Sequence, residues 1–391
     1  MWHFEDLPSL APDPIFAITA QAKAAGSQAI NGTIGVIMDE QGSVVVFPSV
    51  QKALKDLGAA MQTYDTSYPP LLGLPTFREA VHALVLPHLP PHRIASIAST
   101  AGTGALALNL RLLTLFHPQA TVMLPVPAWV NHLPVCEASG LQVLAVPCLG
   151  KDGLPSTGSL TAAIEQATGP VAVLLQVGCH NPTGLDFSKE QWEALADCLA
   201  HCGQLALLDF AYQGFGGEPE EDAKIITLFT DREVPTLIAW SASKNHAIYG
   251  LRCGCALAVT PDEEMQKKVE VNFSRVTRGM HSAAPTFGQS VVARVQQAYS
   301  SEWRADLRAC RTVLQQKRSL LQQALPKHFS PSLAGRGMFA MLPLTVTQIQ
   351  KLRKDHAVYL TDDGRINIAG IPFDRIDRLC AAVIDVAGER V

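Results

Sequence analysis

The sequence has little net charge and no long apolar segment, and each absence excludes a class of protein. Lys and Arg number 31 against 35 Asp and Glu, for a formal net charge of −4. A near-neutral chain gives no electrostatic reason to expect nucleic acid or an anionic membrane as a partner. The longest apolar runs, such as VAVLLQV at 171–177, are shorter than the roughly 20 residues that span a bilayer. We therefore expect neither a nucleic-acid-binding nor a membrane protein.

The cysteine pattern argues against a metal site. The nine cysteines are an odd number and include no Cys-x-x-Cys pair. Cys198 and Cys202 are four residues apart, but the chain has no second matching pair that would complete a zinc site. We expect reduced, mostly buried thiols and no bound metal.

The composition that remains is typical of a core-rich globular enzyme. Hydrophobic residues make up 48% of the 391 positions and charged residues 17%, enough apolar material for two domains. The start, MWHFEDLPSLAPDPIF, has no basic region followed by an apolar core, so it does not resemble a secretory signal. A cytoplasmic enzyme is the expectation.

Short apolar runs alternate with helical stretches through the middle of the chain. The runs lie at 121–127, 141–147, 171–177, 204–210 and 236–240. Such alternation predicts an α/β domain with a mainly parallel central sheet flanked by helices. In that architecture ligands bind beyond the carboxyl ends of the strands, where the polar turns of this sequence lie.

The stretch WSASKNHAIYGLRCG at 240–254 carries the first functional signal. Lys244 follows a buried strand, with Ser241 and Ser243 beside it and Arg252 eight residues later. A partly desolvated lysine has a lowered pKa and can form an imine with an aldehyde, while hydroxyls and a guanidinium can hold a phosphate. This combination suits pyridoxal 5′-phosphate (PLP). The alternative is a solvated surface lysine.

Other strand ends offer groups that suit the same cofactor. Asp209 could pair with a pyridine nitrogen, Tyr212 and Asn181 could hydrogen-bond a phenolic oxygen, and Trp129 could stack on the ring. Their ordinary alternatives are a capping aspartate and a core tryptophan. A further turn consists of Gly102, Thr103 and Gly104 and lies at a predicted helix N-terminus. Its exposed backbone N–H groups would favour an anion there.

Several motifs together give the chain its family resemblance. These are PVPAWVNH, CHNPTG, LLDFAYQGFGGEPEED, SASKN followed by Arg252, and GRINIAG. These motifs resemble those of the fold-type I, PLP-dependent class I aminotransferases of the aspartate/aromatic amino acid branch. They align with that family in a single register over nearly the whole chain. The resemblance implies a large PLP-binding domain at 45–311, a small α/β domain at 12–44 and 312–391, and an N-terminal arm at 1–11.

The resemblance also implies a role for each cofactor-binding residue. Lys244 would carry the Schiff base, Asp209 would pair with the pyridine nitrogen with His132 behind it, and Tyr212 and Asn181 would contact the phenolic oxygen. Trp129 would stack on the ring. The residues implied around the phosphate are Gly102, Thr103, Gly104, Ser241, Ser243, Arg252 and Tyr68 of the second subunit of a homodimer.

For the substrate, the resemblance implies two arginines. Arg365 would bind the α-carboxylate bidentately, aided by Asn181 and the backbone of Gly35. Arg278, with Ser282 nearby, would reach from the other subunit to the side-chain carboxylate of a dicarboxylic substrate. The expected reaction is ping-pong transfer of an amino group from an amino acid to 2-oxoglutarate.

Some positions depart from the aspartate-enzyme pattern toward less polar residues. Ala283 and Ala284 follow Arg278, and Ile37, Met38 and Val44 lie near the expected mouth of the site. Fewer polar groups lower the desolvation cost of admitting an aromatic ring, so we expect aromatic amino acids as well as aspartate to be donors. A strictly aspartate-selective enzyme is the alternative.

Three further functions compete with transamination. A PLP-dependent lyase could use the same scaffold, although Arg278 argues against it. A non-catalytic ligand sensor on this fold would be expected to carry an added DNA-binding module, for which the chain has no spare length. A nicotinamide dehydrogenase would need a fuller glycine fingerprint than the GTG turn provides.

Overall fold

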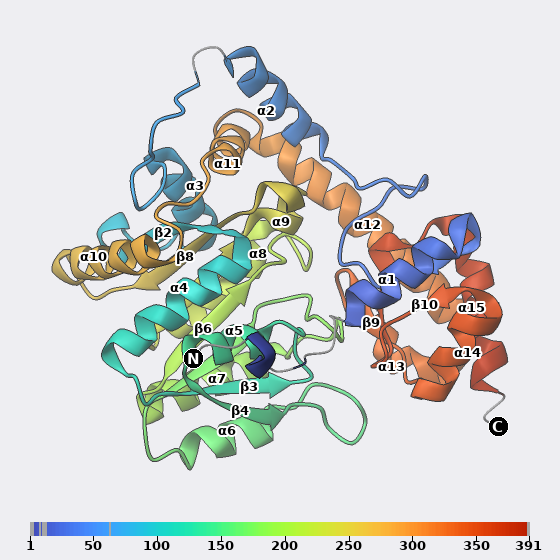
Figure 1. The fold of residues 1–391 in the computed structure, drawn as a ribbon. Coiled ribbons are helices and arrows are strands. Elements are labelled where there is room, and N and C mark those ends of the chain that lie inside the picture. The colour runs from blue at the N-terminus through green and yellow to red at the C-terminus, as the bar shows by residue number, and fades with distance from the viewer. Residues whose placement is uncertain (1–3, 8, 10–13, 62–63, 389–391) are drawn as a thin grey trace.

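The computed structural model describes residues 4–7, 9, 14–61 and 64–388, and its largest feature is a seven-stranded sheet (Figure 1). The strand order is β2-β8-β7-β6-β5-β3-β4. The five apolar runs predicted from the sequence all form strands of this sheet. In spatial order the strands are β2 (Ile94–Thr100), β8 (Cys253–Val259), β7 (Thr236–Ser241), β6 (Leu205–Phe210), β5 (Val171–Gln176), β3 (Thr121–Val126) and β4 (Gln142–Pro147).

All strands of this sheet run in one direction except β8, which is antiparallel to β2 and β7 on either side. The predicted mainly parallel α/β architecture is therefore confirmed. The strand β8 was not among the apolar runs predicted to form strands. Its direction follows from the short connection after β7, because a parallel return would need a longer crossover than residues 242–252 supply.

The register of the central strands brings their carboxyl ends to one edge. Gln176 pairs with Asp209 across β5 and β6, and Phe210 pairs with Trp240 across β6 and β7. Residues that directly follow these strands therefore emerge side by side, although they are 30 or more positions apart in the sequence. This edge is where an open α/β sheet binds its ligands.

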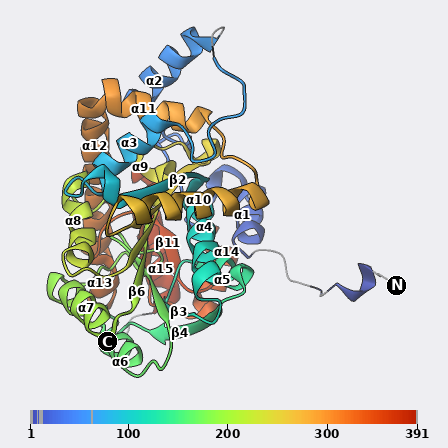
Figure 2. The same cartoon turned by 90° about the vertical axis from the view of Figure 1, so that its left-hand side faces the viewer.

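Helices cover both faces of the sheet (Figures 1 and 2). Alternate strand residues point to opposite faces, so Leu174 packs with α4, α5 and α10 while Val173 packs with the helices on the other side. The helices of this larger body are α2 (Pro48–Ala59), α3 (Pro75–Val85), α4 (Ala101–Phe116), α5 (His132–Ser139), α6 (Gly158–Glu165), α7 (Lys189–Cys202), α8 (Pro219–Thr230), α9 (Ala242–Asn245), α10 (Glu263–Met280) and α11 (Phe287–Ala298).

A smaller unit beside the sheet is built from both ends of the chain. Two short strand pairs, β1 with β10 and β9 with β11, pack with helices around an apolar cluster of their own. The helix α12 runs from the larger body into this unit (Figure 1). The elements are α1 (Pro14–Ala24), β1 (Ile30–Asn31), α12 (Ser300–Ala324), α13 (Ser330–Leu333), β9 (Phe339–Met341), α14 (Val346–His356), β10 (Val358–Tyr359), β11 (Arg365–Asn367) and α15 (Ile376–Ala387).

The domain boundaries stay a prediction. The one between 311 and 312 falls inside α12, which continues through it as a single helix. Of the predicted arm, residues 1–3, 8, 10 and 11 lie outside the described residues, and the short turn Phe4–Asp6 stands away from the body in Figure 2.

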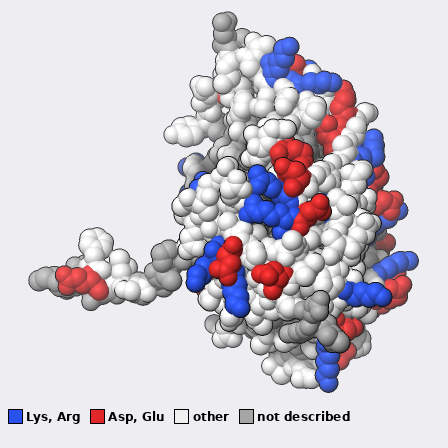
Figure 3. Space-filling view, turned by 90° about the vertical axis from the view of Figure 1, so that its right-hand side faces the viewer, with Lys and Arg blue, Asp and Glu red and all other residues white. Residues whose placement is uncertain are grey.

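The surface of the smaller unit carries no single sign of charge. On the face drawn in Figure 3, basic and acidic side chains lie next to one another. Among the described residues, no helix has the length and apolarity needed to cross a bilayer, and no cluster of His, Cys, Asp and Glu could hold a metal ion. All nine cysteines are unpaired; six are buried and three are partly exposed.

A buried lysine joins α12 to the hairpin that precedes α2. The Lys317 side chain is 1% exposed, and its ammonium lies 3.1 Å from Glu40 Oε1 and 4.8 Å from the centre of the Phe373 ring. Glu40 also accepts a hydrogen bond of 2.6 Å from the backbone N–H of Phe373. One carboxylate therefore both neutralises the lysine and ties the hairpin to the smaller unit.

Replacing Glu40 by glutamine is expected to destabilise the protein more than replacing Lys317 by methionine. Glu40→Gln leaves a buried ammonium without its counter-charge. We expect a cost of about 2 kcal/mol, below the roughly 3–5 kcal/mol of fully buried pairs, because the Glu40 side chain is 42% exposed. Urea unfolding of both single variants and of the double variant measures this. If Glu40→Gln costs the same with or without Lys317, the two charges are not coupled.

Candidate active site

Lys244 lies against a cavity of about 200 Å³ at the carboxyl edge of the sheet. It is in the single helical turn α9 directly after β7, which Ser241 caps by accepting a 3.2 Å hydrogen bond from the N–H of Ser243. The pKa of the Lys244 amine is lowered to about 8, chiefly by burial; the charge of Asp209 opposes the shift and that of Arg252 adds to it. More of the amine is neutral near pH 7 than in a solvated lysine, and the neutral amine is the nucleophile.

Asp209 is the second-last residue of β6, and its carboxylate reaches the same cavity while hydrogen-bonded to a histidine on its other side. The Nε2 atom of His132 lies 2.8 Å from Asp209 Oδ2, and both side chains are buried. Because a carboxylate can only accept, His132 donates this hydrogen bond. The Trp129 ring stands edge-on to His132, with ring centres 5.3 Å apart, and forms another wall of the cavity.

Tyr212 follows β6 and lines this cavity, and Asn181 follows β5 and lines a second cavity beside it. The Nδ2 of Asn181 donates to the Tyr212 hydroxyl at 3.4 Å, and the Lys244 ammonium lies 5.3 Å from the centre of the Tyr212 ring. Burial raises the pKa of Tyr212 well above its ordinary value, so the hydroxyl keeps its proton and can donate it to an acceptor in the cavity. The buried Oδ1 of Asn181 has no hydrogen-bond partner among the described residues.

The opposite end of the cavity gathers groups that attract an anion. Gly102 and Thr103 lie in the first turn of α4, Ser241 and Ser243 at the end of β7, and Arg252 before β8, and all five line the cavity. A Cβ on Gly102 would lie 3.1 Å from the Cβ of Ser241, so glycine lets the two turns approach closely. Helix N–H groups, hydroxyls and a guanidinium together form a site for a phosphate.

Backbone strain occurs at this end of the cavity. Ala101 and Arg252 both adopt left-handed conformations, with φ of 60° and 48°. Such conformations cost a non-glycine residue about 1–3 kcal/mol and persist where the surrounding structure enforces them. Here Gly254 packs so closely on the start of α4 that a Cβ would lie 2.5 Å from the carbonyl carbon of Ala101.

A second cavity of about 220 Å³ lies beside the first and contains Asn181 and Arg365. The buried Arg365 guanidinium donates to the Thr33 carbonyl at 2.8 Å and lies 5.1 Å from the centre of the Phe339 ring. Gly35 packs on the same ring, where a Cβ would be 3.1 Å from Phe339 Cζ. The remaining apolar lining consists of Ile15, Ile18, Ala128, Val130 and Pro182.

Five predicted site residues do not line either cavity in this chain, and Gly35, on the Phe339 ring, is one of them. Gly104 is buried in α4, where a Cβ would lie 2.4 Å from Thr100 Oγ1, so packing explains this glycine. Tyr68, Arg278 and Ser282 lie away from both cavities, and Tyr68 is 94% exposed. The assignments of Tyr68 and Arg278 to the site of a second subunit stay predictions.

Sequence reasoning missed four residues that line the first cavity: Gln176, Asn131, Ala211 and Ala101. Gln176 ends β5, pairs in register with Asp209 and accepts a 3.3 Å hydrogen bond from the N–H of Asn181. A polar residue that ends an apolar strand was a usable signal for Gln176. The other three have none, because Asn131 and Ala211 stand in connecting segments and Ala101 begins α4, and only the fold brings these positions to the cavity.

The two cavities fit PLP and an amino acid by the chemistry of their linings. Arg252 and the α4 N-terminus suit the phosphate, the Asp209 carboxylate suits a protonated ring nitrogen, and the Lys244 amine suits an aldehyde. Asn181 has a buried amide oxygen that a bound molecule could pair, and leaving such an atom unpaired costs about 1–3 kcal/mol. Arg365 suits a carboxylate beside the ring.

Comparisons with known proteins agree with this geometry. A family model described as aminotransferase class I and II matches residues 28–383. The aromatic-amino-acid aminotransferase of Escherichia coli is 31% identical over 394 residues, 97% of this chain and 98% of that protein. The mitochondrial aspartate aminotransferase of Schizosaccharomyces pombe is 31% identical over 393 residues, 97% and 89% of the two chains.

A solved structure extends the comparison to the fold. The Burkholderia pseudomallei aromatic-amino-acid aminotransferase, described as covalently bound to pyridoxal phosphate, superposes with a TM-score of 0.94 at 27% identity. The match covers 99% of this chain and 100% of that one. The resemblance inferred from the motifs is confirmed, and the lyase, sensor and dehydrogenase alternatives are not favoured. The chain belongs to the class I and II aminotransferase family, and its chemistry is PLP-dependent transamination.

Proposed function

We propose that this aminotransferase transfers the amino group of aromatic amino acids and of L-aspartate to 2-oxoglutarate. The observation that carries the proposal is the pair of adjoining cavities. Lys244 and Asp209 face the first, and Arg365 reaches the second, whose remaining walls are largely apolar. Relatives that carry aromatic and aspartate aminotransferase names match the chain about equally well.

The residues of the first cavity would hold the cofactor at both ends. Arg252, Ser241 and the first turn of α4 would bind the phosphate, and Asp209, oriented by His132, would bind the ring nitrogen. When bound, PLP supplies an electron sink for the negative charge that develops on the substrate Cα. Asp209 keeps that sink effective by holding a proton on the nitrogen.

Lys244 would act as the base of the reaction. Its amine lies against the cavity with a pKa lowered to about 8 by burial, so it can take a proton from the substrate Cα near neutral pH and give it back. Tyr212 and Asn181 would hydrogen-bond the phenolic oxygen and set the tilt of the ring. The protein thus supplies a movable proton and a fixed geometry.

Arg365 would orient the substrate in the second cavity. Its planar guanidinium can hold the α-carboxylate with two hydrogen bonds, and this aligns the Cα–H bond relative to the ring. Ile15 and Ile18 of α1, with Ala128 and Val130, present apolar surface to the same space. An aromatic side chain could pack on this apolar surface at little desolvation cost, beside the polar residues Thr361, Asp362 and Asp363 that also line the cavity.

A homodimer completes the proposal. Phe4, Leu7 and Tyr68 are 93%, 68% and 94% exposed, an arrangement that suits contact with a second copy better than contact with water. Arg278 is exposed at the end of α10 and does not line the cavities of its own chain. It would reach a dicarboxylic substrate only in a neighbouring subunit.

The less polar positions noted in the sequence contribute unequally to this selectivity. Ile37 and Ala284 are buried in the main apolar cluster, where their effect on substrates would be indirect. Met38, Val44 and Ala283 remain at least partly exposed, and Met38 and Val44 bridge the hairpin that also carries Glu40. These three are the stronger candidates for tuning the donor preference.

A panel of amino donors tests the proposed substrates. Phenylalanine, tyrosine and aspartate are each mixed with the holoenzyme and 2-oxoglutarate, and glutamate formation is measured along with the cofactor absorbance. Transfer from both classes of donor is expected. Transfer from aspartate alone would support the selective alternative, and release of ammonia or pyruvate without a 2-oxo acid would indicate a lyase. No transfer from any donor would contradict the proposal.

Replacing Arg278 by leucine is expected to impair dicarboxylic substrates selectively. Loss of a charged hydrogen bond costs about 1.5–3 kcal/mol, so kcat/KM for aspartate should fall roughly 10- to 100-fold while that for phenylalanine changes little. Arg275→Leu, which removes an exposed arginine of the same helix, is the matched control. Equal losses for both donors would show that Arg278 does not select the side chain.

A further inference from the structure

Two loops present Asn181 and Tyr212 to the cavity, and a carboxylate fastens each loop. Asp186 Oδ1 accepts a 3.0 Å hydrogen bond from the N–H of His180, which closes the loop after β5 around Asn181. The side chain of Asp186 is 8% exposed. The carboxylate thus stabilises the turn from His180 to Asp186, which contains Asn181.

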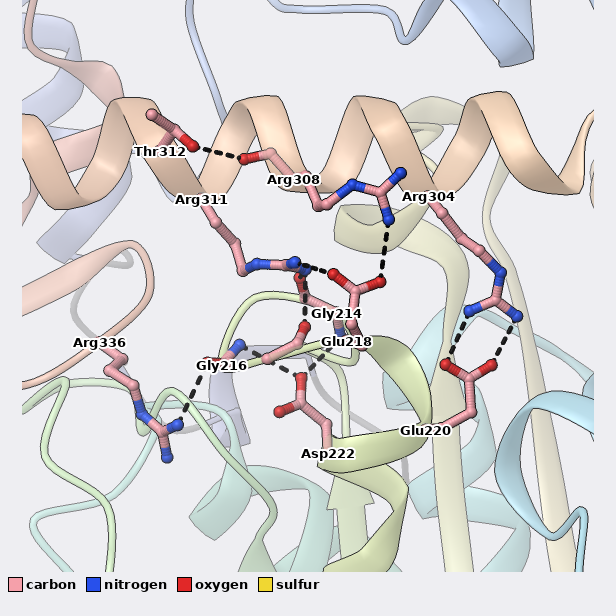
Figure 4. A network of polar contacts seen from close by, with 11 residues as sticks. Gly214, Gly216, Glu218, Glu220, Asp222, Arg304, Arg308, Arg311, Thr312 and Arg336 are labelled. Carbon is pink, nitrogen blue, oxygen red and sulfur yellow. Dashed lines mark hydrogen bonds and ion pairs between the residues drawn. The ribbon is translucent and has the colours of Figure 1, made fainter.

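Asp222 performs the same task for the loop after β6. Its Oδ2 accepts hydrogen bonds from the N–H groups of Gly214 at 2.7 Å and Gly216 at 3.2 Å, as Figure 4 shows. Tyr212 stands two residues before the first of these glycines. Burial raises the pKa of the Asp222 carboxyl to about 6, while the two N–H donors and the charge of Arg336 oppose that shift.

Arg336 bridges these two loops from the smaller unit. Its Nη2 lies 3.1 Å from Asp186 Oδ2 and its Nη1 donates to the Gly216 carbonyl at 3.1 Å. Its backbone N–H donates to the Gly184 carbonyl at 2.8 Å. In Figure 4 the Arg336 side chain points at the loop that Asp222 fastens. One guanidinium therefore contacts the Asn181 loop and the Tyr212 loop together.

The backbone around Arg336 is packed tightly on the Asn181 loop. A Cβ on Gly335 would overlap the Gly184 carbonyl oxygen at 1.9 Å, and one on Gly337 would lie 2.5 Å from the Cβ of Cys179. The two flanking glycines let the chain approach this closely. This packing therefore fixes the backbone position from which the Arg336 side chain extends.

Arginines of α12 hold the same β6 loop from its other side. Arg311 donates to the carbonyls of Gly214 and Gly217 at 2.7 Å, and both Arg311 and Arg308 pair with Glu218 (Figure 4). These contacts do not involve the loop of Asn181. They provide a matched comparison, because Arg308 joins the same network without bridging the two loops.

We propose that Arg336 is a positioning residue for the cofactor ring. By joining Asp186 to the Gly216 carbonyl it fixes the placement of Asn181 relative to Tyr212, and so the two hydrogen bonds to the ring's phenolic oxygen. The inference rests on the proposed function, since it concerns the same cofactor. Because Arg336 belongs to the smaller unit, movement of that unit would shift Asn181 relative to Tyr212 and so change their hydrogen bonds to the ring.

The test is a pH titration of the visible absorbance of the bound cofactor in the holoenzyme. Groups that donate hydrogen bonds to the phenolic oxygen weaken its hold on the proton that it shares with the nitrogen joining lysine to the cofactor. They therefore lower the pH at the midpoint of the titration. Arg336→Met should raise the midpoint by about one pH unit or somewhat less. Arg336→Lys should give a smaller rise, and Arg308→Met should leave the midpoint unchanged.

A double-variant cycle separates positioning from general stability. In a Tyr212→Phe background, Arg336→Met should add less than half of its original shift, because one of the positioned groups is already missing. An equal shift in both backgrounds, or a lowered melting temperature without any spectral shift, would overturn the proposal. If Arg336→Met does not fold, the Arg336→Lys titration decides, since an unchanged midpoint would also overturn it. A wild-type protein without a cofactor spectrum would instead contradict the proposed function.

Discussion

Replacing Lys244 by alanine is expected to leave a folded protein without measurable transamination. Lys244 is the only lysine among the residues that line the two cavities, and alanine would remove both the proposed covalent attachment and the proposed base. The measurements are glutamate formation from phenylalanine or aspartate and the absorbance of the bound cofactor. The variant should bind PLP without the absorbance band of the lysine adduct.

A matched lysine provides the control. Lys224 lies on the exposed face of α8, paired with Glu221 at 2.8 Å, and Lys224→Ala should keep nearly full turnover. Substantial activity in Lys244→Ala would end the mechanism proposed for this cavity. Loss of activity in both variants would point to a general defect of preparation rather than to Lys244.

The lowered pKa of Lys244 adds a pH dependence with a definite sign. The neutral amine attacks the aldehyde, and below a pKa of about 8 its fraction falls about tenfold per pH unit. The rate at which the apo-protein combines with PLP should therefore rise with pH and level off above about 8. A rate that keeps rising to pH 10 would show that Lys244 behaves like a solvated lysine.

Replacing Asp209 by alanine is expected to produce the second large loss. The buried carboxylate would pair with the protonated ring nitrogen, and removing one member of a buried pair costs roughly 3–5 kcal/mol. The value of kcat/KM for aspartate should accordingly fall by roughly a hundredfold to several thousandfold. Steady-state kinetics at saturating 2-oxoglutarate measure the loss.

The control variant for Asp209 keeps the negative charge and changes the length of the side chain. Asp209→Glu retains a carboxylate, so it should recover part of the activity even though the 2.8 Å contact with His132 is disturbed. Asp209→Ala with more than half of the original kcat/KM would show that the carboxylate does not support the ring nitrogen.

Local sequence signals predicted much of the fold and the site. The apolar runs at 171–177 and 204–210 become β5 and β6 because strands buried on both faces read as continuous apolar segments. Asp209, near the end of the second run, and Tyr212, just past it, line the cavity of Lys244. Asn181, past the other run, donates a hydrogen bond to Tyr212, since parallel strands end at one edge. Gly104 shows the limit, because a glycine required by packing looks in sequence like one required by a ligand.

Other features depended on contacts that no local pattern encodes. The strand β8 reads like its neighbours, and only its short connection to β7 makes it antiparallel. Gln176 becomes a wall of the cavity because its register pairs it with Asp209. The bridge of Arg336 to Asp186 joins positions 150 residues apart, and nothing near Arg336 in the sequence indicates its partner.

The sequence by itself determined five strands of the main sheet, their alternation with helices and the chemical groups at the strand ends, because apolar period and turn residues act between near neighbours in the chain. It also determined the family, since the motifs occur in one order and register. Only the tertiary structure decided which of these groups share a cavity. Strand order and register bring Lys244, Asp209 and Gly102 together, and the packing of both chain ends places Arg365 beside them.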